Sequence, residues 1–280
     1  MLQRLKAIFG SIYRLYEHSG FSMAGAVAFG FVVSLFPFCI FLGALAGTFG
    51  GRVLADAAVH QLFQLMPAKV AESLSPEVNA IMTERRFDLL TYSGAAALFF
   101  ATSANESLRS ALNVAYRVRE TRPYIVCLFL SMLSVLVTAV TVLAFTSAAV
   151  IGPEVASHYG LTWLTDLLDL KFLTVGVRYL VAVAVFGLQL IIVHKYVAAG
   201  RRQFSEVWPG VLLSVVLMLA AVSAYSRYLD FNDYTKFYAG LSQLMVTLIF
   251  FQVTAIIMIL GAELNRGLIE IRKPATPVAS

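Results

Sequence analysis

The chain has 280 residues, of which 59% are hydrophobic and only 13% are charged, and its formal net charge is +5. Because soluble domains usually carry about 25% charged residues, this composition excludes a large water-facing domain and is typical of an integral membrane protein. We predict an all-α polytopic fold: a single membrane domain over residues 1–280, with six transmembrane helices, both termini in the cytoplasm and short amphipathic helices in the first periplasmic loop.

Residues 1–20 are predicted to form an amphipathic helix on the membrane surface. Apolar residues recur there at helical spacing, and basic residues lie between them. This pattern is typical of helices that lie in the membrane interface. The apolar run that follows is too long for a signal peptide and has no clear cleavage site, so we interpret it as the first span.

A spanning helix needs about 20 predominantly apolar residues. Six segments meet this requirement: 23–49, 89–112, 124–151, 172–197, 207–228 and 238–264. In the second segment, the apolar part Leu89–Ala104 would cover only about 24 Å at 1.5 Å per residue. This span therefore crosses the bilayer only if it continues through Asn105, Glu106 and Arg109.

The first span contains Pro37, which cannot donate a backbone hydrogen bond to Val33, so we predict a helix break or kink there. Ser34 stands where its hydroxyl could help to satisfy the disturbed backbone. Broken helices form binding sites in some transporters. A proline in a membrane helix can also be an ordinary packing feature, and both interpretations of Ser34 and Pro37 stay open.

Residues 50–87 form the only long connection and are predicted to be a periplasmic helical loop. Leu54, Ala58 and Leu62 share one helical face there, and Pro67 and Pro76 interrupt the pattern. We expect short amphipathic helices that lie on or dip into the outer face of the membrane. They form either a lid over a cavity or a cap that only packs.

Polar residues form a stripe along the second span at intervals of three or four positions. They are Thr102, Asn105 or Glu106, Arg109, Asn113 and Tyr116. A charge at the bilayer centre costs at least about 2.5–3.5 kcal/mol, so this stripe should face the protein interior or a watery cavity. The alternative is a helix that enters the cytoplasm here, with Glu106 and Arg109 as a surface pair.

Glu263 and Asn265 lie at the matching depth of the sixth span. Removing one partner of a buried ion pair costs about 3–5 kcal/mol, so buried charges should be paired. We predict that Arg109 is held between Glu106 and Glu263, and that the asparagines satisfy the remaining donors and acceptors. The candidate cluster is Asn105, Glu106, Arg109, Asn113, Glu263 and Asn265, which is an inner gate in a transporter and a fixed clasp in a scaffold.

Basic residues are distributed unevenly between the two sides of the membrane. Thirteen of the 21 Lys and Arg residues fall in the N-terminal segment, the second and fourth loops and the C-terminal tail, which predicts that these segments are cytoplasmic. The positive charge is thereby explained, and no nucleic-acid partner is expected. Cys39 and Cys127 both lie in apolar runs, where a disulfide or a metal site is not expected.

Five short stretches resemble the YihY/BrkB family of bacterial inner-membrane proteins. They are AGAVAFGFVVSLFP, SLRSALNVAYRVRETRP, FSEVWPG, YAGLSQ and LGAELN, in this order and spacing. One departure is visible, because the tryptophan common in the middle of the last span of the family is replaced near Phe250. The resemblance implies a six-helix inner-membrane protein but supplies no settled activity, since some members have been labelled ribonuclease BN and others linked to serum resistance.

The ribonuclease label finds no support in the residues of this chain. Metal-dependent hydrolysis needs clustered His and carboxylate ligands, whereas the four histidines, His18, His60, His158 and His194, are scattered along the sequence. No P-loop or dinucleotide motif is present. We therefore expect no enzyme activity, no catalytic residues, no metal and no cofactor.

Two functions remain, both in the bacterial inner membrane. The first is a transporter or flippase-like protein for a lipid-like or amphipathic envelope solute, which the polar stripe, the predicted break and two sets of three spans favour. The second is a membrane scaffold or assembly protein of the cell envelope that does not transport. The expected partners are membrane lipids, with a second copy of the chain or envelope proteins as further candidates.

Overall fold

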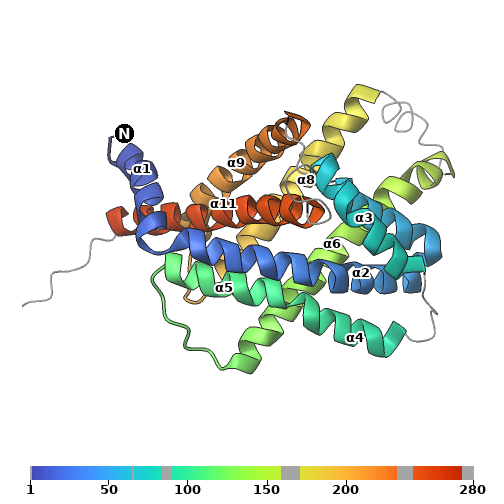
Figure 1. Ribbon diagram of the computed structural model, residues 1–280, viewed down its shortest axis with the longest axis horizontal. Coiled ribbons are helices and arrows are strands. Elements are labelled where there is room, and N and C mark those ends of the chain that lie inside the picture. The colour runs from blue at the N-terminus through green and yellow to red at the C-terminus, as the bar shows by residue number, and fades with distance from the viewer. Residues whose placement is uncertain (1, 65, 84–89, 159–170, 232–241, 273–280) are drawn as a thin grey trace, which may run out of the picture.

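Helices account for almost all of the described residues. The computed structural model describes residues 2–64, 66–83, 90–158, 171–231 and 242–272 (Figure 1). The predicted all-α class is confirmed for this part of the chain. Some positions of the predicted elements lie outside it, namely 1, 65, 84–87, 89 and 238–241.

The described helices are named in chain order. Their bounds are α1 Leu2–Glu17, α2 Gly20–Gln64, α3 Ala68–Thr83, α4 Leu90–Ala101, α5 Ser103–Ala115, α6 Tyr124–His158, α8 Lys171–Ile192, the π-helical turn η2 Val193–Val197, α9 Phe204–Phe231 and α11 Ser242–Arg272. Helices α2 and α11 lie side by side at the centre of the molecule (Figure 1). The N-terminal helix forms as predicted, and its position on a membrane surface stays a prediction.

Four helices of the described chain are long and apolar enough to cross a membrane, which indicates a multi-pass membrane protein. The apolar stretches are Gly20–Ala46, Tyr124–Ser147, Phe204–Leu229 and Leu244–Arg272. They correspond to the predicted first, third, fifth and sixth spans. The predicted fourth span corresponds to α8 followed by η2. Its apolar stretch, Val183–Val197, is shorter than the four stretches given above.

The predicted second span corresponds to two consecutive helices, and its passage through the membrane stays a prediction. Helix α4 ends at Ala101 and α5 begins at Ser103, with Thr102 between them. The Thr102 hydroxyl donates to the Phe99 carbonyl at 2.6 Å, and the Thr102 N–H donates to the same carbonyl at 3.2 Å. A threonine that bonds to a preceding carbonyl in this way competes with the regular helical ladder. The helix is thus interrupted for one residue at Thr102, whose backbone stays in the α-helical region.

The break that was predicted at Pro37 is not observed. Helix α2 runs without interruption through Pro37. Ser34 donates to the carbonyl of Phe31 at 3.2 Å, and not to the Val33 carbonyl that Pro37 deprives of its donor. The apolar core on both sides of this turn, with Val32, Leu35 and Cys39 buried, holds the helix together across the missing bond.

The predicted short helices of residues 50–87 are not all separate. Helix α2 continues through the first part of this segment to Gln64, and α3 is a separate helix within the described residues. Helix α3 buries Val70, Leu74 and Val78 in a core that it shares with α2 and α11. The hydroxyls of Ser73 and Thr247 lie 3.0 Å apart and join α3 to α11. These contacts favour the interpretation of this segment as a cap that packs on the other helices and not as a lid over a cavity.

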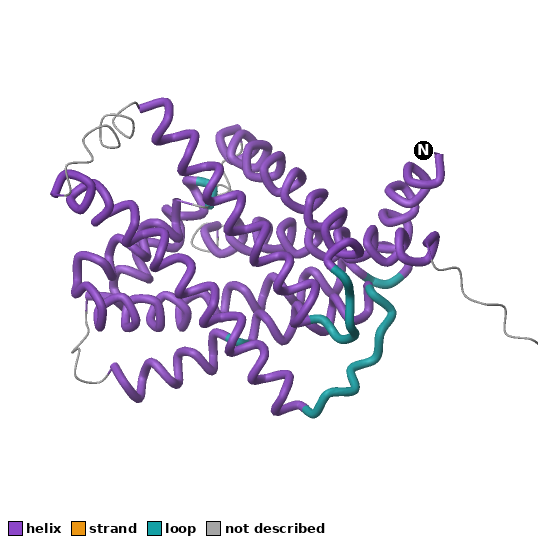
Figure 2. Tube along the Cα trace, turned by 180° about the vertical axis from the view of Figure 1, so that it is seen from behind, coloured by secondary structure: helices purple, strands orange, loops and turns teal. Residues whose placement is uncertain are grey.

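Two loops of the described chain, 116–123 and 198–203, gather at the end of the molecule where α1 packs on α11 (Figure 2). We call this the α1 end. A second core lies there, formed by apolar residues that include Leu15, Leu108, Leu112 and Ile259.

The α1 end is the side that the charge distribution predicts to be cytoplasmic. Reporter fusions after Arg122, Arg202 and Ser280 should therefore report a cytoplasmic location, and fusions within residues 52–86 a periplasmic one. The measurement is the activity of a phosphatase and of a fluorescent reporter at each site. A periplasmic C-terminus would contradict both the orientation and the count of six spans.

Candidate functional site

The C-terminus of α5 is closed by a left-handed residue, which directs the side chains of the α1 end. Arg117 has φ 55°, and the Val118 N–H donates to the Asn113 carbonyl at 2.9 Å. This is the hydrogen bond of a Schellman cap, in which glycine is usual. An L-residue in this conformation costs about 1–2 kcal/mol. The turn carries the Arg117 side chain toward α11, where it pairs with Glu263 at 3.2 Å and with Glu270 at 2.8 Å.

Glu263 is fully buried and is surrounded by basic groups. Besides Arg117, it contacts His18 Nδ1 at 2.8 Å and Arg14 Nε at 3.5 Å. The predicted pair between Arg109 and Glu263 is therefore wrong. Helix α5 packs its apolar face against α11, whereas the polar residues Asn105 and Glu106 bond to Ser131 of α6, and Arg109 pairs with Glu106 and Glu120.

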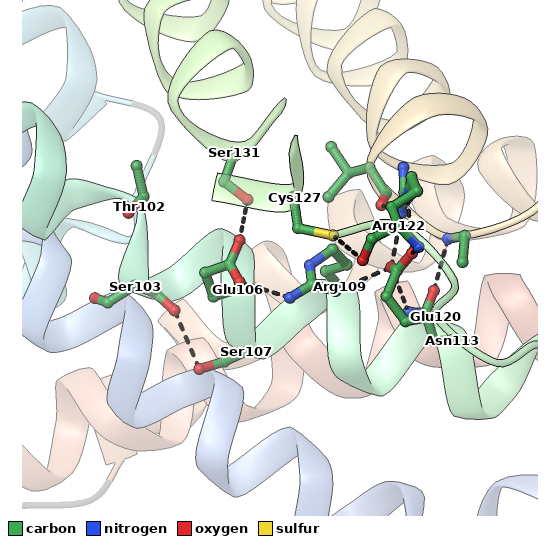
Figure 3. A network of polar contacts seen from close by, with 12 residues as sticks. Thr102, Ser103, Glu106, Ser107, Arg109, Asn113, Glu120, Arg122, Cys127 and Ser131 are labelled. Carbon is green, nitrogen blue, oxygen red and sulfur yellow. Dashed lines mark hydrogen bonds and ion pairs between the residues drawn. The ribbon is translucent and has the colours of Figure 1, made fainter. Parts of the chain in front are cut away.

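Arg109 belongs to a second network, drawn in Figure 3. Its guanidinium pairs with Glu106 at 2.6 Å, as predicted, and with Glu120 at 2.9 Å. Glu120 accepts two further hydrogen bonds at 2.8 Å from the Arg122 side chain. The Arg122 guanidinium next to Glu120 holds the pKa of that carboxyl far below its usual range. Acidic and basic groups therefore alternate from Glu106 to Arg122.

Glu120 and Arg122 are functional candidates that the sequence reasoning missed. The Arg122 guanidinium also donates to the carbonyls of Tyr196 and Val197, at 3.1 and 2.8 Å, and so ties the 116–123 loop to η2. The signal that could have revealed the pair is the lone acid within RVRETRP, a segment otherwise interpreted only as a basic topology signal.

Polar contacts continue from Glu106 into the membrane part of the molecule. The Ser131 hydroxyl of α6 donates to Glu106 at 2.5 Å, and Asn105 donates to the Ser131 carbonyl at 3.3 Å. Further along, the Gln189 amide of α8 donates to the Ser134 hydroxyl at 3.3 Å. We call Asn105, Glu106, Ser131, Ser134 and Gln189 the polar seam.

The middle of the polar seam, at Ser131 and Ser134, is buried, and its other residues are partly exposed. Ser131 is fully buried and Ser134 is 3% exposed. The side chains of Glu106 and Arg109 are only 20% and 13% exposed. The polar stripe of α5 thus faces α6, and the Glu106–Arg109 pair is not a solvated surface pair.

The remaining asparagines bond at separate places. Asn113 donates to Glu120 at 3.1 Å and accepts from the Ala199 N–H at 2.6 Å. Asn265 accepts from the Gly210 N–H at 2.7 Å and donates to the Tyr116 hydroxyl at 3.1 Å. The six predicted cluster residues therefore divide into neighbouring networks around the end of α5 and do not form one cluster.

The Asn265 network joins α9 to α11 at close range. Tyr116, which binds Asn265, also lies 2.9 Å from Nδ1 of the fully buried His194. A Cβ at Gly210 would overlap the Gly261 carbonyl oxygen, so only glycine permits this approach. Pro209 deprives the Ser205 carbonyl of its helical donor, and Arg272 of α11 supplies one at 3.2 Å.

Side chains that could hold a metal are dispersed in the described part of the chain. No three His, Cys, Asp or Glu residues gather there in a metal-binding arrangement. His18 pairs with Glu263, His194 with Tyr116, and His60 is exposed. The side chain of His158 lies outside the described residues. Cys39 and Cys127 are free and buried.

Comparison with known proteins places the chain in a family. The family model described as "Virulence factor BrkB" matches residues 11–279. A similar protein of Bacillus subtilis (strain 168), named "Putative ribonuclease-like protein YfkH", is 28% identical over 266 residues, and the match covers 93% of each of the two chains. No solved structure matches. The family match takes in the polar seam, the Glu263 network and the Asn265 network, and the chain belongs to the BrkB family of proteins.

Proposed function

We propose that this protein moves a lipid-like or amphipathic solute of the bacterial envelope across the inner membrane. The observation that carries the proposal is the polar seam. Gln189 lies eight residues before Val197, the last residue of η2, or about 12 Å along the helix. Since the hydrocarbon core is about 30 Å thick, the seam runs from the α1 end to near the middle of the membrane.

The polar seam lies beside the interruption between α4 and α5. The break at Thr102 comes one turn before Glu106, between α4 and α5. Irregular backbone at membrane depth is tolerated where it is buried in protein or lines a cavity, and transporters commonly place discontinuous helices at their solute sites. The combination of a helix break, a carboxylate and hydroxyl groups suits a polar headgroup whose apolar chains stay in the lipid.

Arg109, at the inner end of the seam, keeps an acidic partner if either of its two carboxylates moves away. Arg109 touches both Glu106 and Glu120, so a shift of either acid leaves the guanidinium with a partner. A buried charge that keeps a partner throughout a movement avoids the several kcal/mol that an isolated charge costs. This arrangement is suitable for a gate.

The substitution Glu106→Gln tests the proposal and should leave the fold intact, because Arg109 keeps Glu120 and the glutamine can still accept from Ser131. In liposomes that contain a fluorescently labelled phospholipid, the rate of exchange between leaflets is followed by quenching with dithionite. The natural chain should accelerate exchange, and Glu106→Gln should slow it about tenfold, which is the effect of one lost charge-assisted contact.

The matched control is Ser223→Ala, since Ser223 is exposed on α9 and bonds only to the Leu219 carbonyl of its own helix. This variant should keep the rate of the natural chain. If the natural chain exchanges lipid no faster than protein-free liposomes, the proposal fails for phospholipids. Equal rates for the natural chain and Glu106→Gln would remove the seam from the path.

One observation favours the second candidate, a membrane scaffold. Glu263 is held by Arg14, His18 and Arg117, which come from α1, the α1–α2 turn and the turn after α5. Four segments joined at one buried carboxylate make a fixed clasp. A scaffold would show no flux in the liposome experiment and would retain an envelope protein when purified from the membrane.

We further propose that the protein is not a ribonuclease, although its relative carries a ribonuclease-like name. The scattered histidines of the described chain support this proposal. Purified protein incubated with RNA and Mg²⁺, Mn²⁺ or Zn²⁺ should degrade it no faster than the same sample with EDTA. Metal-dependent cleavage that copurifies with the folded protein would contradict the proposal.

A further inference from the structure

A cleft with a volume of about 150 Å³ opens at the α1 end, apart from the polar seam. It lies between the 198–203 loop, the start of α9 and the end of α11. The residues that matter in its wall are Tyr116, Gly200, Arg201, Arg202, Glu206 and Arg266. None of them belongs to the seam, so the cleft is a separate site.

The cleft is strongly basic, since three arginines line it against one glutamate. The Glu206 carboxylate accepts a hydrogen bond from the Gln203 N–H at 2.9 Å, which caps the start of α9. Arg266 shares Glu270 with Arg117, at 3.0 and 2.8 Å. The single carboxylate of Glu270 thus pairs with two guanidinium groups and cannot neutralise both, so positive charge remains at the cleft.

Arg202 is the most deeply placed of the three, with 9% of its surface exposed. It donates to the carbonyls of His194 and Ala199, at 3.0 and 2.5 Å, and its guanidinium stacks 3.6 Å from the centre of the Tyr116 ring. Burial raises the pKa of Tyr116 to about 12, so the phenol stays neutral beside it. These contacts hold the guanidinium in place but do not neutralise its charge.

Gly200 lines the cleft beside Arg202. This residue has φ +90°, which favours glycine, and a Cβ there would lie 3.7 Å from the Arg202 guanidinium. Arg201, the next residue, is exposed and forms no salt bridge with a described carboxylate. Two neighbouring arginines, one buried and one exposed, therefore face an open space with donors that suit a tetrahedral oxyanion.

The mouth of the cleft lies where a membrane interface is expected. Phe204 and Trp208 come one turn apart on the first turns of α9 and are 56% and 45% exposed. The apolar stretch Phe204–Leu229 begins here. Exposed aromatic residues at the end of a spanning helix are typical of the headgroup level of the bilayer. A phosphate group at this level is more abundant in lipid than in solution.

We propose that the cleft binds the phosphate group of an anionic phospholipid from the leaflet at the α1 end, with Arg201 and Arg266 at its mouth and Arg202 at its base. Basic recesses between spanning helices are suited to such headgroups. The lipid would occupy a fixed place beside α9 and α11, with its chains along Phe204 and Trp208.

The test compares Arg201→Gln with Arg119→Gln in the full chain, reconstituted into phosphatidylcholine nanodiscs. Arg119 is a matched control, because it is exposed in the 116–123 loop and does not line the cleft. Binding is titrated with spin-labelled phosphatidylglycerol and read from the immobilised fraction of the label. Arg201→Gln should weaken binding about tenfold, the loss expected for one charge-assisted contact, and Arg119→Gln should leave it within about twofold.

Two further arms complete the test. Spin-labelled phosphatidylcholine in place of phosphatidylglycerol should show no immobilised fraction, and inorganic phosphate at millimolar concentration should not displace the labelled phosphatidylglycerol. Equal weakening by Arg201→Gln and Arg119→Gln would overturn the proposal, because it would reduce the effect to general surface charge. Displacement by inorganic phosphate alone would assign the cleft to a soluble anion and would also overturn it.

Discussion

Glutamine in place of Glu263 should strongly destabilise the folded protein. The carboxylate is fully buried, and it is the shared partner of Arg14, His18 and Arg117. Removing one partner of a buried ion pair costs about 3–5 kcal/mol, since the remaining charges lose their compensation. Denaturant unfolding in detergent, followed by the helical circular dichroism signal, should show a loss of this size in the free energy of unfolding.

A double-mutant cycle identifies the partner of Glu263. The changes Glu263→Gln and Arg117→Gln should be non-additive by about 0.5–3 kcal/mol, because the two side chains lie 3.2 Å apart. The same cycle with Arg109→Gln should be additive, since Arg109 pairs with Glu106 and Glu120. A coupling of Glu263 to Arg109 as large as its coupling to Arg117 would contradict the separation of the Glu263 network from the Arg109 network.

The second large effect is expected at Gly210, where α9 and α11 touch. An alanine Cβ would overlap the Gly261 carbonyl oxygen and lie 2.5 Å from Nδ2 of Asn265. Because the first of these is backbone, the two helices must move apart, and overpacking of this kind costs about 1–3 kcal/mol. The Asn265 bonds to Gly210 and Val207 would be lost as well.

The matched control is Gly25→Ala in α2. A Cβ at Gly25 meets nothing within 4 Å, so this change should only add helix propensity, which is favourable by about 0.5–1 kcal/mol. Both variants are measured by thermal unfolding in detergent. If Gly210→Ala were as stable as Gly25→Ala, the close approach of α9 and α11 would be incorrect.

The long apolar runs were the part of the fold that the sequence could predict. Each of α2, α6, α9 and α11 contains an apolar stretch long enough to span a bilayer, and a run of that length is the signal of a membrane helix. The break at Thr102 could not be predicted in the same way. The Thr102 hydroxyl donates a hydrogen bond to the Phe99 carbonyl, but a threonine in an apolar run is compatible with a regular helix as well.

The depth of the polar residues was predictable, whereas their partners were not. Helical spacing placed Arg109 and Glu263 near the same end of the molecule, but it did not give the rotation of α5 relative to α11. The left-handed turn at Arg117 then brings a different arginine to Glu263. An arginine in this conformation has no sequence signature, because glycine is the residue that normally marks such a cap.

The central claim, that the polar seam is a path for a polar group through the membrane, is tested most directly by labelling of cysteines in α8. Gln189→Cys and Leu188→Cys are made in a chain with Cys39 and Cys127 replaced by alanine, and a small membrane-impermeant thiol reagent is added to membranes. Leu188 is 51% exposed on a surface that we expect to face lipid, and Gln189 lies on the seam. A water-accessible seam predicts that Gln189→Cys is modified and Leu188→Cys is not. If Gln189→Cys proves as unreactive as Leu188→Cys, the seam is dry and the transport account is contradicted.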